Sequence, residues 1–137
     1  MSDPPAIPVP APDEKSRPWF AAAAEGRLLL QRCDACGTQR FPLWERCVDC
    51  WSTDWSWAEA SGRGTLFSWG RMHRIYHPGF EEEVPYVVAI VELEEGPRIE
   101  TRLVNVPPDA EIRAGIPVVA AFQRFSEDVQ VPLFELA

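Results

Sequence analysis

All four cysteines of the chain lie in two C-x-x-C pairs, Cys33 with Cys36 and Cys47 with Cys50. This spacing lets a tight turn bring both sulfurs of a pair to one side, and two such knuckles facing each other form a tetrahedral four-sulfur zinc site. The ten residues between the pairs still allow one strand to leave and another to return. Four sulfur ligands leave no open position for water, so we expect a structural Zn²⁺ that performs no hydrolysis.

Two disulfides or a redox dithiol are the alternative interpretations of these cysteines. A redox C-x-x-C normally opens a helix within a βαβ pattern, and no such pattern surrounds either pair. Disulfides need an oxidising compartment. The first residues, 1–8, have neither the basic start nor the continuous apolar stretch of a signal peptide. We therefore expect a cytoplasmic protein whose cysteines bind metal.

The composition limits the classes of partner. With 137 residues, of which 46% are apolar, the chain can form one or two small domains with a packed core. No apolar run approaches the roughly 20 residues of a membrane span. The formal net charge of −8 argues against general binding to nucleic acid, which depends on neutralising phosphates.

The N-terminal part of the sequence predicts an arm and a short helix. Residues 1–15 contain five of the fourteen prolines and few groups that could pack, so we expect a disordered arm. Ser16 is suited to cap a helix that runs to about residue 24. Pro18 is tolerated in its first turn, and Gly26 favours its end.

The rest of the sequence predicts a mainly β protein. Strands are expected at 28–31 and 40–42 around the first knuckle, and then at 64–76, 86–93, 98–104, 118–125 and 129–134. Five strands with a longer connection after the third fit a five-stranded barrel of the OB type, although another small β-barrel or meander is the alternative. The expected organisation is an arm (1–15), a helix with the zinc ribbon (16–60) and an OB-fold domain (61–137).

The order of motifs resembles a known family of zinc-ribbon plus OB-fold proteins, formerly a domain of unknown function, whose members are associated with acyl-CoA metabolism. The resemblance covers about residues 16–137 and lies in 25–37, 41–42, 47–50, 61–69, 85–96 and 115–118. The family usually has proline after its third cysteine, where this chain has Val48, and we expect no effect on the metal.

The resemblance implies a rubredoxin-like zinc ribbon and a non-catalytic role. Stand-alone members of the family pair with thiolase-fold enzymes (thiolases, condensing synthases or aldolases) that act on acyl-CoA thioesters. This chain would stabilise such a partner and help to form its CoA-substrate site. A stand-alone acyl-CoA-binding protein is the main alternative, and an OB module for single-stranded nucleic acid is a weaker one.

The residues themselves predict no catalytic constellation. The cysteines are committed to the metal, and His73 and His77 would stand about 13 Å apart on a continuous strand. The acidic run 81–83 is expected to be a solvated loop, which offers no burial to shift a carboxyl pKa. We expect no catalytic residue in this chain alone.

Two groups of side chains are candidates for binding. Because the phosphates of CoA require basic partners and its adenine can stack on aromatic rings, the CoA or partner candidates are Arg40, Arg46, Arg63, Trp69, Arg71, His73, Arg74 and Tyr76. An equally good interpretation is that these arginines only make the surface soluble and that these aromatic residues belong to the core. Large rings that could anchor a partner protein are Trp19, Phe20, Trp51 and Trp55.

Overall fold

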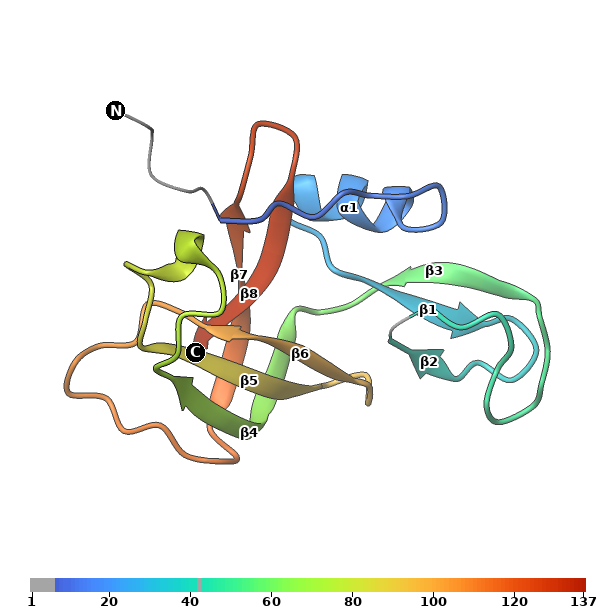
Figure 1. Ribbon diagram of the computed structural model, residues 1–137. Helices are drawn as coiled ribbons and strands as arrows, with labels where there is room; N and C mark the ends of the chain where they lie inside the picture. The colour runs from blue at the N-terminus through green and yellow to red at the C-terminus, as the bar shows by residue number, and fades with distance from the viewer. Residues whose placement is uncertain (1–6, 42) are drawn as a thin grey trace.

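The computed structural model describes residues 7–41 and 43–137, so the first six residues of the predicted arm and Pro42 of the predicted return strand lie outside the described residues. Figure 1 shows a barrel, a helix that lies beside it and a small sheet that projects to one side. The elements are α1 (Arg17–Ala24), β1 (Leu29–Cys33), β2 (Gln39–Arg40), β3 (Trp55–Glu59), β4 (Arg63–Met72), η1 (Pro78–Phe80), β5 (Tyr86–Leu93), β6 (Arg98–Leu103), β7 (Pro117–Arg124) and β8 (Gln130–Leu136). Among the described residues, no helix is both long and apolar enough to cross a membrane.

Helix α1 forms where the sequence predicts it, but its N-terminus is held differently. The side chain of Ser16 makes no capping hydrogen bond to the helix. Instead the Asp13 N–H donates to Ser16 Oγ (3.0 Å), and the Ser16 N–H donates to Asp13 Oδ1 (2.7 Å). The helix ends as expected, because Gly26 takes the left-handed backbone (φ +77°) that other residues adopt at a penalty.

The projecting sheet is the zinc ribbon, with strand order β2-β1-β3. Strand β3 was not predicted, since the tryptophans after the second knuckle were interpreted only as a docking surface. In the antiparallel register, Trp55 lies opposite Cys33 and Trp57 opposite Gln31. Alternate residues of a strand share a face, so the two indoles meet edge to face with centroids 5.0 Å apart. Part of the tryptophan-rich segment is therefore a structural strand.

The second sheet is a closed five-stranded barrel in the order β4-β5-β6-β8-β7, as predicted for the OB type. Strand β4 closes it by pairing with β5 and, through its first three residues, with β7. The strand predicted over 64–76 is shorter than expected. It ends at Met72, which pairs with Tyr86, the first residue of β5, so the chain beyond it has no neighbouring strand.

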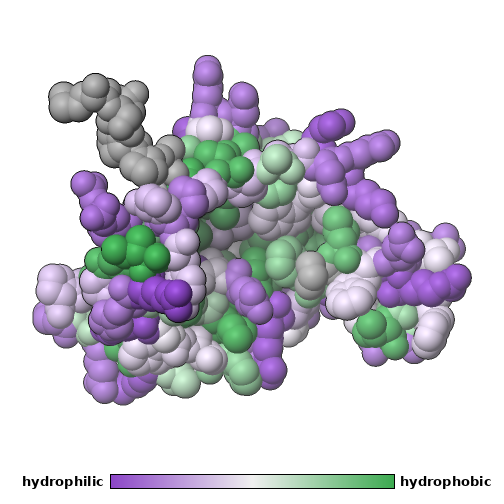
Figure 2. All heavy atoms as spheres, in the orientation of Figure 1, coloured by the Kyte–Doolittle hydropathy of each residue, from purple (hydrophilic) through white to green (hydrophobic). Residues whose placement is uncertain are grey.

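One hydrophobic core joins the three parts. The barrel interior is filled by fully buried side chains such as Phe134, Leu66 and Val91. Leu28 and Leu30, which lead into the ribbon, belong to the same cluster. Helix α1 lies against β8 (Figure 1), where Gln130 Nε2 donates to the Ala23 carbonyl (2.9 Å). Outside this core, hydrophilic side chains cover much of the face in Figure 2, and hydrophobic ones occur in small separate groups. Because Leu28 and Leu30 belong to the core cluster of the barrel, the base of the ribbon is fixed to the barrel.

Candidate metal centre and exposed ribbon surface

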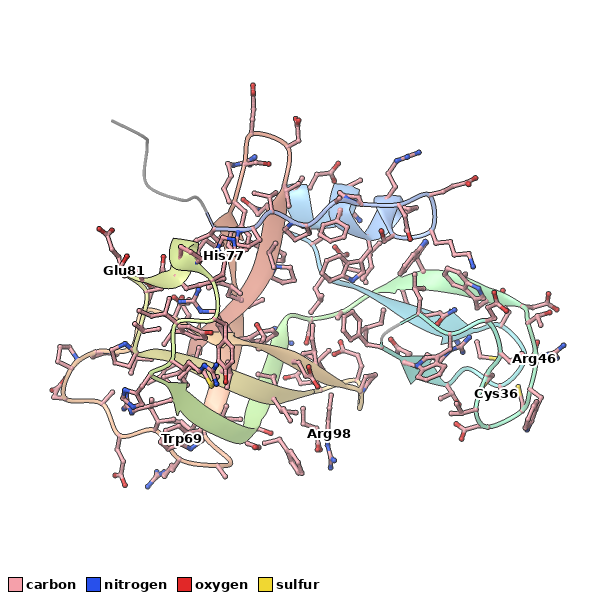
Figure 3. The ribbon with its side chains drawn as sticks, in the orientation of Figure 1. Cys36, Arg46, Trp69, His77, Glu81 and Arg98 are labelled. Atoms are coloured by element: carbon pink, nitrogen blue, oxygen red, sulfur yellow. The ribbon has the colours of Figure 1, made fainter. Side chains whose placement is uncertain are left out.

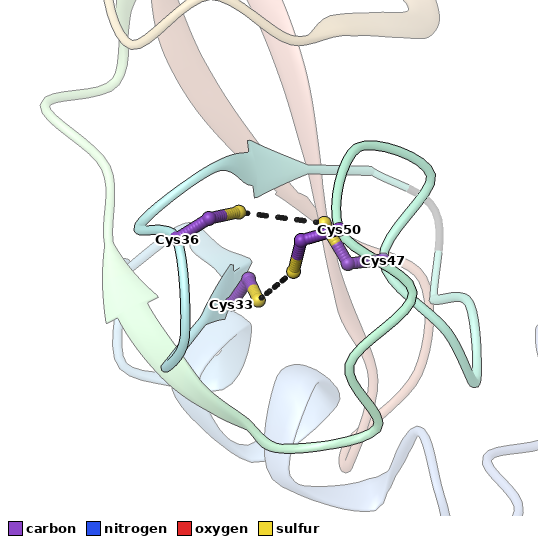
Figure 4. A group of neighbouring side chains, drawn as sticks. All are labelled: Cys33, Cys36, Cys47 and Cys50. Atoms are coloured by element: carbon purple, nitrogen blue, oxygen red, sulfur yellow. Dashed lines mark hydrogen bonds between the residues drawn. The ribbon is translucent and has the colours of Figure 1, made fainter.

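The four cysteine sulfurs form one cluster, drawn in Figure 4, and all of them lie within 4.8 Å of one another. The shortest separations are 3.5 Å between Cys33 and Cys50 and 3.6 Å between Cys36 and Cys47. Four sulfurs at Zn–S distances of about 2.3 Å stand about 3.8 Å apart in a tetrahedron. All four cysteines are free, which excludes the disulfide alternative. The donor set fits a structural Zn²⁺.

The two knuckles repeat the same backbone pattern. In the first, Gly37 N–H donates to the Cys33 carbonyl and Cys33 N–H to the Thr38 carbonyl, both at 2.9 Å. In the second, Trp51 N–H donates to the Cys47 carbonyl and Cys47 N–H to the Ser52 carbonyl at the same distance. The residue after the last cysteine of each knuckle is left-handed, with φ +80° at Gly37 and +67° at Trp51.

Polar side chains that sequence reasoning missed tie the knuckles together. Thr38 Oγ1 donates to Asp49 Oδ2 (2.9 Å), which connects the end of the first knuckle to the second. Ser56 Oγ donates to Asp34 Oδ1 (2.7 Å), which connects the first knuckle to β3. An aspartate inside each C-x-x-C motif, Asp34 and Asp49, was the sequence signal for such contacts, but the hydroxyl groups that they accept from depend on the tertiary fold. These two hydrogen bonds hold the knuckles and β3 together without any contribution from a metal ion.

The sulfurs differ in how readily they ionise. The Thr38 hydroxyl beside the sulfur lowers the pKa of Cys36 to about 6, and the Cys36 N–H lowers the pKa of Cys33. The Ser52 N–H lowers the pKa of Cys50, but the Cys33 sulfur, burial and the other two sulfurs outweigh it and raise that pKa to about 12. Four thiolates cannot crowd together without a cation. Zn²⁺ would supply that charge, and its binding releases the remaining protons.

The ribbon exposes three large apolar side chains, one before the second knuckle, one inside it and one directly after it: Trp44 (55% exposed), Val48 (68%) and Trp51 (71%). We call these three residues the ribbon tip. Trp44 is held in place by the buried Gln31, whose Nε2 donates to the Trp44 carbonyl (2.8 Å) and whose Oε1 accepts from the Trp44 N–H (2.9 Å). Trp44 is therefore displayed from a fixed backbone, and the hydrogen bonds of the second knuckle fix the backbone that carries Val48 and Trp51.

The four predicted docking residues lie in different environments. Trp19 packs against the core and donates its indole N–H to the Leu29 carbonyl (3.0 Å), so it mainly attaches the helix to the ribbon. Phe20 stacks edge to face on Trp19 and is half-buried, as is Trp55 beside Trp57. Trp51 alone of the four is largely exposed. Sequence reasoning missed Trp44 and Val48 at the same surface.

The structure divides the predicted CoA or partner residues into separate groups (Figure 3). Arg46 lies at the ribbon near Cys36, and its Nη1 donates to the Trp51 carbonyl (3.2 Å), whereas Trp69 lies on the barrel. Arg40 is only 6% exposed, so its guanidinium does not face the surface expected for a phosphate ligand. Arg63 is exposed but is paired with Glu94 (3.0 Å).

The remaining candidates lie on β4 and the loop after it. Arg71 stands over the Trp69 ring at 5.8 Å, and Arg74 over the Tyr76 ring at 5.0 Å. His73 is exposed on the same loop. His77 accepts the Gly79 N–H at Nδ1 (2.9 Å), a local turn contact. Within the acidic run, Glu83 is half-buried and contacts Arg102 (3.3 Å), so the run is less uniformly solvated than predicted.

Two family models cover most of the chain. Residues 20–56 match the model described as "ChsH2, rubredoxin-like zinc ribbon domain", and residues 57–123 match "ChsH2, C-terminal OB-fold domain". These matches agree with the observed ribbon and barrel, so the predicted fold is confirmed. Together with the sulfur cluster, they also confirm the prediction of a structural zinc ion.

Individual proteins show the same relationship. A "DUF35 domain-containing scaffold protein" of Methanocaldococcus jannaschii is 36% identical over 113 residues, which are 82% of this chain and 79% of that protein. A "Probable enoyl-CoA hydratase alpha subunit" of Thermomonospora curvata is 43% identical over 95% of this chain, but the chain spans only 40% of its length. A solved structure described as "Ltp2-ChsH2(DUF35) aldolase" matches with a TM-score of 0.81 and 42% identity, covering 93% of this chain and 98% of that one.

Proposed function

Because the chain belongs to the ChsH2 and DUF35 family of zinc-ribbon and OB-fold proteins, we propose that it is a non-catalytic accessory subunit of a thiolase-fold enzyme acting on acyl-CoA thioesters. The names of its relatives support this proposal: one is a scaffold protein, one is a hydratase alpha subunit, and one solved relative is described as an aldolase. The two hydratase names, that of the Thermomonospora curvata subunit and that of a Mycobacterium tuberculosis subunit, both name a CoA substrate.

The chain spans different shares of the relatives that it matches. The chain matches nearly the whole of the solved chain described as an aldolase, at 98% of its length. It matches only 40% of the Thermomonospora curvata hydratase alpha subunit and 39% of the 3-oxo-4,17-pregnadiene-20-carboxyl-CoA hydratase alpha subunit of Mycobacterium tuberculosis. Most of each hydratase subunit therefore has no counterpart in this chain.

The observation that carries the proposal is the ribbon tip. A left-handed backbone suits glycine, which the first knuckle has at this place, but the second knuckle has Trp51. A non-glycine residue there is uncommon and costs on the order of 1 kcal/mol. Its ring stabilises the isolated chain little, since it is 71% exposed. Backbone strain that displays a large ring to solvent is explained by contact with a partner, because buried tryptophans dominate protein interfaces.

The zinc and the barrel would give this surface its rigidity. Metal binding contributes roughly 10–16 kcal/mol in zinc-finger peptides, more than a ribbon of this size can gain from its own core. A fixed surface loses less entropy on docking than a flexible one. Two predicted CoA-binding residues contact the ribbon tip: Arg40 bonds the Trp44 carbonyl but is buried, whereas Arg46 bonds the Trp51 carbonyl and is exposed. We therefore place the shared CoA contact at this edge of the ribbon.

Reconstitution tests the proposal. The chain is affinity-purified from its native cell, the co-purifying thiolase-fold enzyme is identified by mass spectrometry, and both proteins are produced separately. Turnover of an acyl-CoA thioester is then measured for each protein and for the mixture. We expect no turnover by this chain and at least about tenfold more turnover by the pair than by the enzyme alone. Thiolysis or aldol cleavage by this chain alone would rule the proposal out.

The stand-alone acyl-CoA-binding alternative makes a different prediction. It requires measurable calorimetric binding of an acyl-CoA to the isolated chain and no change when the enzyme is added. The accessory-subunit proposal requires the affinity for acyl-CoA to rise when both proteins are present. The nucleic-acid alternative predicts a gel shift of oligonucleotides at low salt, which the net charge of −8 argues against.

A further inference from the structure

A basic groove lies at one end of the barrel, away from the ribbon tip. It has a volume of about 660 Å³ and is bordered by the ends of β4, β6 and β7 and the start of β5. Each of the three strand ends contributes one guanidinium, from Arg71, Arg102 and Arg124, and Glu83 is the only carboxylate in the lining. The lining therefore carries three positive charges against one negative charge, a net of +2, within a chain whose net charge is −8.

The other hollows among the described residues differ in charge. In four of them, carboxylates equal or outnumber basic side chains. A surplus of positive charge in a single concavity of an acidic protein is not expected from a solubilising surface, where the two signs are interspersed. The groove therefore differs from these four hollows in the sign of its net charge, which is positive.

Arg102 shows that the groove has unused hydrogen-bonding capacity. Its side chain is only 17% exposed and lies over the Tyr86 ring at 4.7 Å. Its Nη2 donates to Glu83 Oε2 (3.3 Å), while Nε and Nη1 are buried and have no partner among the described residues. Buried donors without acceptors are destabilising. Because neither nitrogen is accessible to solvent, an anion with several oxygens would supply the missing acceptors once the Arg102 side chain turns toward the groove.

We propose that this groove binds an anion of the phosphate class that carries at least two negative charges. Guanidinium groups match phosphate oxygens through paired, charge-assisted hydrogen bonds. A dianion balances the net charge of +2, whereas a single carboxylate would leave half of it uncompensated. The amide of Gln123, also in the lining, can add a neutral donor. The ligand is inorganic diphosphate or the diphosphate of a nucleotide, a group that CoA also contains. Arg71 is one of the CoA candidates, but binding to this groove requires neither the partner enzyme nor the ribbon tip.

Calorimetry of the full, zinc-loaded chain at low ionic strength tests the site with two probes, inorganic diphosphate and ADP. We expect saturable binding of one anion per chain that weakens as salt is added. Equal affinities would indicate free diphosphate as the ligand, and tighter binding of ADP would indicate a nucleotide. Zinc content is measured after each titration, since diphosphate itself binds metal ions. Absence of saturable binding by both probes overturns the proposal.

Two arginine variants separate the groove from general charge. Arg124→Gln changes an exposed side chain of the groove and should weaken binding by about tenfold or more, as expected for loss of one charge-assisted hydrogen bond. Arg98→Gln removes the same charge from β6 outside the groove, where Arg98 pairs with Glu92, and should leave the affinity within about twofold. An unchanged affinity in Arg124→Gln, or equal losses in both variants, would contradict the assignment.

Discussion

Replacing Trp51 by glycine removes the ring that we expect a partner to cover while keeping the backbone conformation of the knuckle. Glycine adopts φ +67° without penalty, which relieves roughly 1 kcal/mol of strain. Its greater freedom in the unfolded chain offsets this gain by about 0.5–1 kcal/mol. The free energy of unfolding should therefore change by less than about 1 kcal/mol, and zinc should still bind.

The effect on partner binding should be much larger. A tryptophan buries about 150–250 Å² when covered, and 71% of Trp51 is exposed, which leaves roughly 110–180 Å² for the partner. At about 25 cal/mol per Å², complete coverage contributes about 3–4 kcal/mol. The Kd of the complex should therefore rise by a factor of roughly one hundred to one thousand. This is an upper estimate, because it takes the ring as fully buried.

The assay is titration of the purified enzyme partner by calorimetry, with zinc content and thermal unfolding of each variant measured alongside. Phe67→Ser is the matched control, since Phe67 is also an exposed ring but lies on β4, away from the ribbon, and is not among the binding candidates. It should leave the Kd within about threefold. A Kd for Trp51→Gly that also stays within about threefold, in a variant that folds and binds zinc, would refute the reasoning.

Three further changes test the framework that holds this surface. Gly64→Ala on β4 would push a methyl group against the Glu92 carbonyl and to 2.9 Å from Val91 Cγ1, so we expect a loss of about 2–4 kcal/mol in denaturant unfolding. Gly70→Ala on the same strand is the control: its methyl group meets only Val88 at 4.0 Å, so stability should change by less than about 1 kcal/mol. Comparable losses of stability in the two variants would contradict the close approach of Gly64 to the Glu92 carbonyl. Gln31→Leu removes the acceptor of the Trp44 N–H and one of the two donors to the Trp44 carbonyl, the other being Arg40 Nη2, and should cost about 1–3 kcal/mol. An unchanged midpoint would mean that Gln31 does not fix Trp44. The Arg63 guanidinium holds the pKa of Glu94 below its usual value, so the pair stabilises the fold at pH values above the ordinary glutamate pKa. This stabilisation is lost as the pH falls through the lowered pKa of Glu94. Arg63→Gln should raise the pKa of Glu94 in an NMR titration, and an unchanged pKa would exclude the ion pair as the cause of the shift.

The sequence predicted the parts of the fold that local signals determine. The alternation of residues 98–104 predicted β6, and the start and stop signals at Ser16, Pro18 and Gly26 predicted α1. The cysteine spacing predicted the sulfur cluster because a C-x-x-C turn is itself a local structure. Strand β3 was missed, although Trp55 and Trp57 alternate with smaller residues, because exposed docking rings and strand residues produce the same pattern of aromatic residues.

The features that were not predicted depend on contacts between distant segments. The Thr38 to Asp49 bond exists only once the knuckles face each other. The burial of Arg40 depends on how the chain after β2 folds back, where Trp44 accepts a bond from its Nη2 (3.3 Å). Likewise, Arg102 and Arg124 lie 22 positions apart in the sequence and meet at one groove only because the barrel closes. No local pattern in the sequence specifies such convergence.

The central claim is that a zinc-held ribbon presents the surface that the enzyme partner recognises. The direct measurement is the affinity of the partner for the same chain with its zinc, after removal of the zinc under reducing conditions, and after zinc is restored. We predict one zinc ion per chain at the start, loss of binding when the metal is removed, and recovery when it returns. Undiminished binding by the zinc-free chain would contradict the claim.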